Sequence, residues 1–195
     1  GDLSGAGRAY WEQANAYEQT RQIEKFHEAI RRSLEYCQQA GDHYGMGNAL
    51  NIIGMIEADI THAIQRYQQA VSAFEKAGYL DRIQAGRGNL AIPYLDLGLY
   101  SRSLRLQREV VETNRKMNAQ LGMAYALGNA AAAQLFMGHL KDAQDTVHEF
   151  AALNAILGDP YLEQQIQASW ADLNFLMGKI QLALRHQKTA LKVTQ

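Results

Sequence analysis

The sequence predicts an all-α protein, a right-handed α-solenoid of about five antiparallel helix pairs. Three observations lead to this prediction. Marker residues recur with a period near 40 along the whole chain, and each repeat contains two apolar stretches with helical spacing. Alternating β-branched runs bounded by turn pairs, which would indicate strands, are absent from the sequence.

The repeat is visible in two columns of residues. Leu97-Gly98, Met137-Gly138 and Met177-Gly178 place glycines at a step of 40, and one step back is Ala58. Five residues after each of these positions comes another small residue. Because independent columns stay in register, we take the period as structural. The small residues of the second column are Ala63, Ser103, Ala143 and Ala183.

A second marker, a glycine or asparagine, closes each repeat and is typical of helix ends in the left-handed conformation. It occurs at Gly41, Gly78, Asn118 and Gly158. The first of these steps is 37 rather than 40, so we expect three residues to be missing between the opening turn of the second repeat and its first helix. The markers divide residues 1–195, taken as one repeat domain, into units of approximately 3–40, 43–77, 80–117, 120–157 and 160–195.

Each unit is expected to be a helical hairpin. In the second unit residues 48–53 form the first apolar stretch, and residues 64–74 contain the second, which is spaced as a helix. Pro160 stands where a proline opens a helix. Pro93 is the one proline expected inside a helix, where it removes the hydrogen bond to the carbonyl of Asn89 and predicts a kink. The first unit is the least regular, since Phe26 replaces a small residue.

Small residues in the first helices allow the two helices of a hairpin to approach closely. One hairpin cannot bury its own apolar face, so neighbouring units stabilise one another, and the first helices should line a concave side. The residues of this column are Ala14, Asn51, Ala91, Ala131 and Ala171.

The pattern Ala63-x3-Tyr67-x2-Ala70, after a small residue and a glycine-like turn, resembles the tetratricopeptide repeat (TPR). The period of 40, with Gly88-Asn89 and Gly128-Asn129 on first helices, resembles the long variant of Leu-Gly-Asn repeat proteins, kinesin light chains and bacterial maltose-regulator-type sensors. Departures are Val147 and Gln187 in place of the usual aromatic residue. The resemblance implies a scaffold that binds a protein or peptide in its groove, without a cofactor.

Composition excludes several classes of protein. A net charge of −1 and a pI near 6.7 give no basic excess for nucleic acid. No run of 18 apolar residues predicts a membrane span. The single cysteine, Cys37, cannot form an internal disulfide, which favours a reducing compartment, the cytoplasm. Since the first residue is Gly1, we expect a processed product or a piece of a longer protein.

Asn89 and Asn129 occupy the same position on successive first helices, with Ala49 and Ser169 in the same column. The resemblance implies that they line the groove and hydrogen-bond the backbone of a bound peptide. The alternative is that they cap or bridge neighbouring helices. Apolar and charged side chains on the same face complete the predicted site, and Gly88 and Gly128 are expected to leave open space beside them. The candidate partner-binding residues are Arg8, Asn48, Ile52, Asn89, Ile92, Asp96, Tyr125, Asn129, Phe136 and Asp172.

Catalytic and metal-binding patterns are not supported. The glycine pairs 45/47 and 86/88 lack the preceding strand of a nucleotide fingerprint, and close helix packing explains them better. The histidines show no metal-ligand spacing. Asp59-x2-His62 is better explained as a loop pair than as a catalytic dyad. We therefore predict no enzyme activity, no metal and no cofactor.

The predicted function is a protein-interaction module, the scaffold or sensor part of a larger bacterial regulator, which binds a peptide or helix in its concave groove. One alternative is a sensor domain for a small molecule or signalling peptide. Another is a self-association element that forms a homodimer through the C-terminal helix, where apolar residues have the spacing that faces a following unit. These residues are Leu184, Ala190, Leu191 and Val193.

Overall fold

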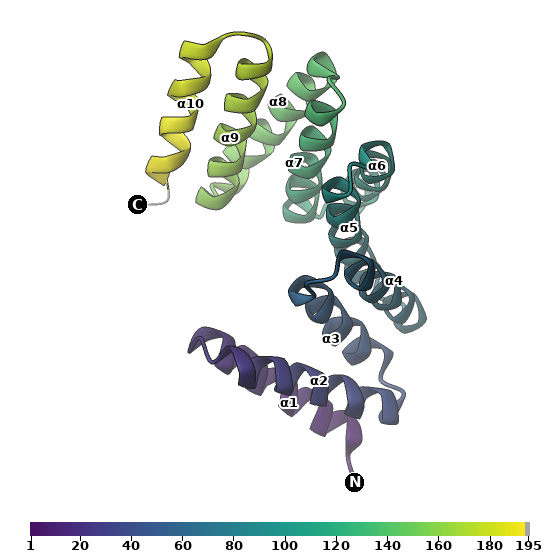
Figure 1. The fold of residues 1–195 in the computed structure, drawn as a ribbon. Coiled ribbons are helices and arrows are strands. Elements are labelled where there is room, and N and C mark those ends of the chain that lie inside the picture. The colour runs from purple at the N-terminus through teal and green to yellow at the C-terminus, as the bar shows by residue number, and fades with distance from the viewer. Residues whose placement is uncertain (194–195) are drawn as a thin grey trace. The chain divides into compact units, whose positions relative to one another are not determined.

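The computed structural model describes residues 1–193, and in this part it contains helices and no strand (Figure 1). The chain forms two compact units, residues 1–93 and the part that begins at Tyr94. In the first unit α1 (Leu3–Gln19) packs on α2 (Ile23–Ala40), and α3 (His43–Ile56) packs on both α2 and α4 (Ile60–Ala77). The helix α5 (Leu80–Asp96) begins in the first unit and ends in the second.

The second unit continues the same arrangement. Here α6 (Tyr100–Lys116) packs on α7 (Gln120–Phe136), and α8 (Leu140–Leu157) packs on α7 and on α9 (Pro160–Leu176). The last helix, α10 (Ile180–Val193), pairs with α9 (Figure 1). The predicted fold class, an all-helical stack of antiparallel helix pairs, is confirmed.

Left-handed residues end the helices at the predicted positions. Gly41, Gly78 and Gly158 close the second helices with φ of 68°, 76° and 67°, and Asn118 takes the same role with φ of 54°. Glycine adopts this conformation without a steric cost, and asparagine is among the residues that tolerate it. Pro160 opens α9 as predicted, directly after the N-cap Asp159.

The missing residues of the second repeat are not where we expected them. The helix α3 has 14 residues, whereas α5, α7 and α9 each have 17. It begins directly after its N-cap Asp42, as α9 begins directly after Asp159. The deletion therefore shortens the helix itself by almost one turn, rather than the segment between the turn and the helix.

Small residues set the spacing of the helix pairs. Ala14, Ala91 and Ala131 are each 0% exposed, and Ala63, Ser103, Ala143 and Ala183 are also buried. In the second unit large side chains fill the space that these columns leave. Phe150 of α8 is fully buried against Leu162 and Ile166 of α9. Burial of such side chains stabilises the fold by about 1.5–3 kcal/mol each.

None of the helices in residues 1–193 is both long and apolar enough to cross a membrane.

Candidate functional site

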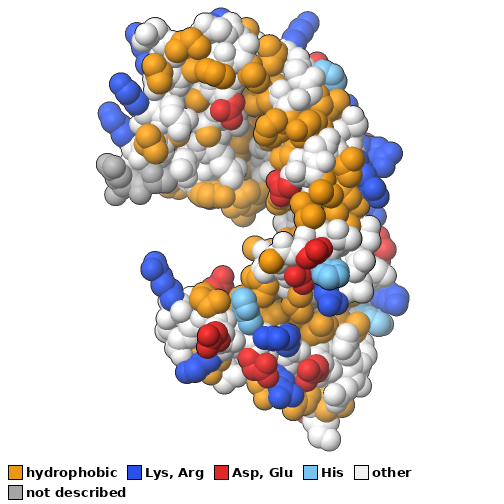
Figure 2. All heavy atoms as spheres, viewed as in Figure 1, with side chains coloured by type: hydrophobic (Ala, Val, Ile, Leu, Met, Phe, Trp, Pro, Cys, Tyr) orange, Lys and Arg blue, Asp and Glu red, His pale blue; other side chains and the backbone are white. Residues whose placement is uncertain are grey.

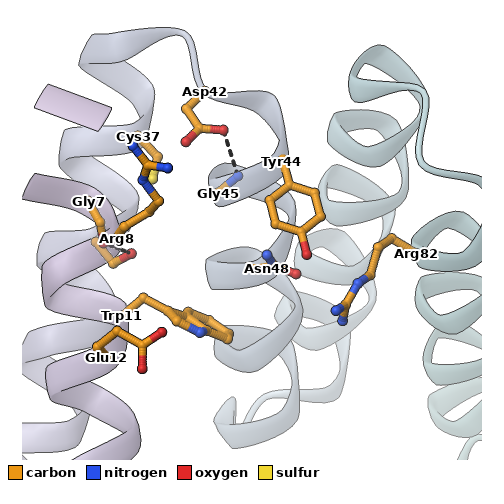
Figure 3. A pocket seen from close by; sticks show the side chains of 11 residues that line it. Gly7, Arg8, Trp11, Glu12, Cys37, Asp42, Tyr44, Gly45, Asn48 and Arg82 are labelled. Carbon is orange, nitrogen blue, oxygen red and sulfur yellow. Dashed lines mark hydrogen bonds between the residues drawn. The ribbon is translucent and has the colours of Figure 1, made fainter. Parts of the chain in front are cut away.

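A pocket of about 260 Å³ opens on the first unit (Figure 3). Figure 3 shows that side chains from three first helices surround it. Two of the lining residues, Arg8 and Asn48, were predicted from the sequence as binding residues. The principal side chains around it are Arg8, Trp11 and Glu12 of α1, Tyr44 and Asn48 of α3, and Arg82 of α5.

Two glycines let α1 and α3 pack tightly against Cys37 at the base of this pocket. A Cβ atom on Gly7 would lie 2.6 Å from the Cys37 Sγ, and one on Gly45 would lie closer still to the same sulfur. The Ser33 hydroxyl also donates a hydrogen bond of 2.8 Å to the Gly7 carbonyl. Burial raises the pKa of the Cys37 thiol, with a further contribution from Asp42, so the sulfur is a poor nucleophile. Its role is packing, as the sequence suggested.

Besides the Glu12 carboxylate, the polar groups that the pocket leaves for a ligand are mainly donors. The Asp42 carboxylate already accepts the Gly45 N–H at 2.9 Å, which caps α3, and the Ser4 hydroxyl at 2.9 Å. By contrast, within residues 1–193 neither Arg8 nor Asn48 makes a side-chain hydrogen bond. Arg82 lies 5.8 Å from the centre of the Tyr44 ring and 3.7 Å from Asp81. The pocket therefore suits a ligand that presents hydrogen-bond acceptors beside an apolar or aromatic part.

The second unit has a larger and more apolar hollow of about 470 Å³, formed by α7 and α9. Phe136 and Phe175 are each 62% exposed, and Leu176 is 51% exposed. Ala132 and the buried Leu135 complete the apolar lining, and Asp172 is the one charged residue in it. Figure 2 shows hydrophobic side chains over α7 and α9, with an acidic side chain over α9.

The hollow exists because of the positions that its aromatic residues occupy. Phe136 is the last residue of α7, and Phe175 lies one residue before the end of α9, where no later turn of either helix covers them. The Tyr100 ring stacks on Phe136 with centroids 5.2 Å apart and fixes its orientation. Asp172 is an exposed residue, but its neighbours remove part of the water around its carboxyl group, and this loss of water raises the pKa of that group. These features give a preformed apolar surface with one carboxylate at its edge.

The two asparagines of this column, Asn89 and Asn129, differ in what the structure shows of their contacts. The Asn89 side chain donates a hydrogen bond of 3.0 Å to Asn51, which joins α5 to α3 in the first unit. The bridging role that we considered for this column is thus observed at Asn89. Asn129 is half-buried on α7, and its contact with a peptide stays a prediction.

The remaining predicted residues are spread over both units. In the first, Ile52 packs against the cluster of Ala14, Phe26 and Ile30, and Ile92 is 40% exposed. In the second, Asp96 is exposed at the end of α5, and Tyr125 lies beside Tyr161 with ring centroids 6.3 Å apart. None of these four lines the pocket or the hollow. Their contact with a partner stays a prediction.

Trp11, Tyr44 and Arg82 were not predicted as site residues. A repeat signal could have identified Trp11, because it lies 37 residues before Asn48 and so occupies the same column one repeat earlier. Tyr44 and Arg82 gave no such signal. Their position in the site depends on the turn Asp42–Gly45 and on the placement of α5, which are three-dimensional features.

The glycine pairs act mainly in packing. A Cβ atom on Gly47 would lie 2.5 Å from the Phe74 ring, and one on Gly86 would lie 3.0 Å from Val71. We expected open space at both Gly88 and Gly128. The structure confirms this for Gly88, but a Cβ atom on Gly128 would meet Phe150 at 3.0 Å, so that expectation was wrong.

The acid and histidine side chains have structural explanations. Asp59 caps α4 by accepting the Thr61 and His62 N–H groups at 2.8 and 2.9 Å, which accounts for the Asp59-x2-His62 pair. No group of three or more histidine, cysteine or acidic residues within residues 1–193 could hold a metal ion.

On the last helix Leu184 is 49% and Leu191 58% exposed, in agreement with an open apolar face. Ala190 does not belong to this face, because it is 4% exposed and lies in the column of the buried Phe150. The side chain of Val193, named with them, lies outside the described residues.

These helix pairs have the arrangement of a TPR-type helical repeat fold. No family model matches the chain, and no curated protein matches it. Two of the solved structures that resemble it do so across almost its whole length. Both are of a Podosopora anserina protein assigned to the kinesin light chains and built of nearly identical TPR-like repeats.

The first of these structures, a variant of that protein with one substitution, is 17% identical in sequence, with a TM-score of 0.75 over 99% of this chain and 96% of that one. The second is also 17% identical, with a TM-score of 0.67 over 98% of this chain and 96% of that one. The likeness establishes the TPR-like fold of this chain.

Proposed function

We propose that this protein is a protein-interaction module that binds a segment of a partner protein, as a peptide or a helix, against its first helices. The observation that supports this proposal best is the apolar hollow of the second unit. Large apolar side chains exposed together indicate an interaction site, whereas single exposed ones are normal. The TPR-like fold agrees with this function, since stacked helix pairs present extended surfaces for partners.

The composition of the hollow fits a site where binding energy is concentrated. Phe136 and Phe175 are both well exposed and lie in one concave surface. Full burial of a phenylalanine contributes about 1.5–3 kcal/mol, so covering the exposed 62% of each ring would contribute about 1–2 kcal/mol per ring toward the roughly 8 kcal/mol of a micromolar affinity. A volume of about 470 Å³ has room for more than one large partner side chain.

The proposal extends to the cellular role. We propose that the chain is the scaffold or sensor part of a larger bacterial regulator that acts in the cytoplasm, where the lone thiol of Cys37 needs no disulfide partner. A full-length gene that encodes an additional DNA-binding or nucleotide-hydrolysing segment would support this role.

The test is a pull-down from the native host with the purified chain, followed by competition with variants of the hollow. Phe136→Ala and Phe175→Ala should each weaken capture of the specific partner at least tenfold. Ile156→Ala is the matched control, because Ile156 is 72% exposed on α8 and does not line the hollow. Equal capture by all variants would exclude the hollow as the binding site.

A specific observation favours a second candidate, a sensor of a small molecule or signalling peptide. The pocket of the first unit combines the guanidinium groups of Arg8 and Arg82 with the aromatic side chains of Trp11 and Tyr44. A screen of acidic metabolites by thermal shift tests it. A ligand of this pocket should raise the melting temperature of the wild-type protein, and Arg8→Ala should remove the increase.

Self-association through α10 is the third candidate, supported by the exposed Leu184 and Leu191. It predicts a concentration-dependent dimer in sedimentation experiments, which Leu191→Glu should convert to a monomer. A wild-type protein that is monomeric at all concentrations would remove this candidate.

A further inference from the structure

We infer that the partner segment presents a lysine or arginine, flanked by apolar residues, to Asp172 in the hollow of the second unit. This inference rests on the proposed function and adds to it the chemical character of the partner.

The charges of the second unit are segregated between its helices. All lysines and arginines from Tyr94 to Val193 lie on α6, α8 and α10, except Lys179 in the turn before α10. The helix α7 has no charged residue at all, and α9 has only Glu163 and Asp172. The two helices that form the hollow are thus apolar and acidic, without a basic side chain on either.

Asp172 is the carboxylate of this surface that lacks a partner. Glu163 accepts hydrogen bonds from Gln167 at 2.8 Å and from Asn154 at 3.4 Å. Asp172 makes neither a hydrogen bond nor an ion pair with a side chain among residues 1–193. Its surroundings partly exclude water, which penalises an unpaired carboxylate, and a cation brought by the partner would relieve this penalty.

The aromatic residues of the hollow favour a cation at the same place. Phe136 and Phe175 line the hollow together with Asp172, and both rings have faces that attract a positive charge. A lysine or arginine has an aliphatic stem that packs on apolar surface while its charged end reaches a carboxylate. Such a side chain satisfies both parts of the surface with one residue.

The same lining identifies the occupant as a protein segment rather than a small polycation. Ala132, Leu135 and Leu176 offer apolar surface that a free polyamine, which is charged along its length, would leave uncovered or would bury at a cost. A polypeptide covers it with apolar neighbours of the basic residue. The occupant is therefore a basic and apolar segment of another protein.

The experiment is a selection from a library of random peptides displayed on phage, with the full chain as the bait. The enriched peptides should contain lysine or arginine beside large apolar residues. Selection on Asp172→Lys should replace the basic residue by an aspartate or glutamate. Selection on Glu109→Lys, which changes an exposed carboxylate of α6, should give the same peptides as the wild-type chain.

Binding of one enriched peptide, measured by fluorescence polarisation, gives the quantitative test. Its affinity should fall about tenfold for Asp172→Asn and more for Asp172→Lys, and should decrease with added salt. Spermidine should not compete at equal concentration. Enriched peptides without a basic bias, or peptide affinities that do not change when Asp172 is substituted, would overturn this inference. The proposed function would still stand in that case if Phe136→Ala abolished binding. Peptides that bind Phe136→Ala and Phe175→Ala unchanged would overturn the proposed function as well.

Discussion

Alanine substitution at Gly88 should stabilise the protein, whereas the same substitution at Gly47 should leave its stability unchanged or lower it. Both glycines lie inside first helices, Gly47 in α3 and Gly88 in α5. Replacing a glycine inside a helix by alanine stabilises the helix by about 0.8–1 kcal/mol, and this gain is common to the two variants. They differ in the space available for the new methyl group.

The magnitude follows from the neighbouring atoms. A Cβ atom on Gly47 would lie 2.5 Å from two carbons of the Phe74 ring, which is 2% exposed and cannot easily move, whereas nothing lies within 4 Å of a Cβ atom on Gly88. Overpacking of a dense core costs about 1–3 kcal/mol. Gly88→Ala should therefore gain about 1 kcal/mol, and Gly47→Ala should be about 1–3 kcal/mol less stable than Gly88→Ala.

Urea unfolding followed by circular dichroism at the helix band measures both variants. For a chain of this length, each kcal/mol of difference in stability corresponds to a shift of about 2–4 °C in melting temperature. Phe74→Leu in the Gly47→Ala background should recover part of the loss, because it removes the ring that the methyl group meets. Equal stability of Gly47→Ala and Gly88→Ala would refute the argument that Phe74 requires a glycine at this position.

Three further predictions follow from individual residues. Pro93→Ala should raise the melting temperature, because it restores the N–H group that can donate to the carbonyl of Asn89 inside α5. A lower melting temperature would show that the buried proline ring contributes more to stability than the restored hydrogen bond does. Burial raises the pKa of Asp172 in the folded state, so the stability that this carboxyl group contributes is present at low pH and is lost as the pH rises through that pKa. Asp172→Asn should therefore be more stable than the wild type near neutral pH and equally stable in acid, below the pKa of a free carboxyl group. A difference in stability that stays constant with pH would contradict the raised pKa. Burial also raises the pKa of the Cys37 thiol. In mildly alkaline buffer iodoacetamide should therefore alkylate this thiol far more slowly in the native protein than in the protein unfolded by urea. Equal alkylation rates would show that the thiol is accessible in the native protein.

The repeat columns were sufficient to predict the fold class. A glycine such as Gly98 or Gly158 indicates that the backbone takes the left-handed conformation at a helix end. This requirement is local and does not depend on contacts with other parts of the chain. The small column at Ala14 and Ala131 reports close helix approach in the same way. A local rule repeated along the chain therefore predicts helices, turns and hairpins.

The candidate site depended on tertiary structure. The sequence placed Asn89 and Asn129 in one column, but only the structure shows that Asn89 donates to Asn51. The column predicted space at both Gly88 and Gly128, yet Phe150 fills the space at Gly128.

The hollow likewise arises because Phe136 and Phe175 come together from the ends of two helices that lie about one repeat apart in sequence. The period of 40 places a residue on a helix and on a face, because those depend on the backbone alone. Which side chains are covered, paired or exposed depends on neighbours from other repeats, and the packing of those side chains exists only in the folded chain.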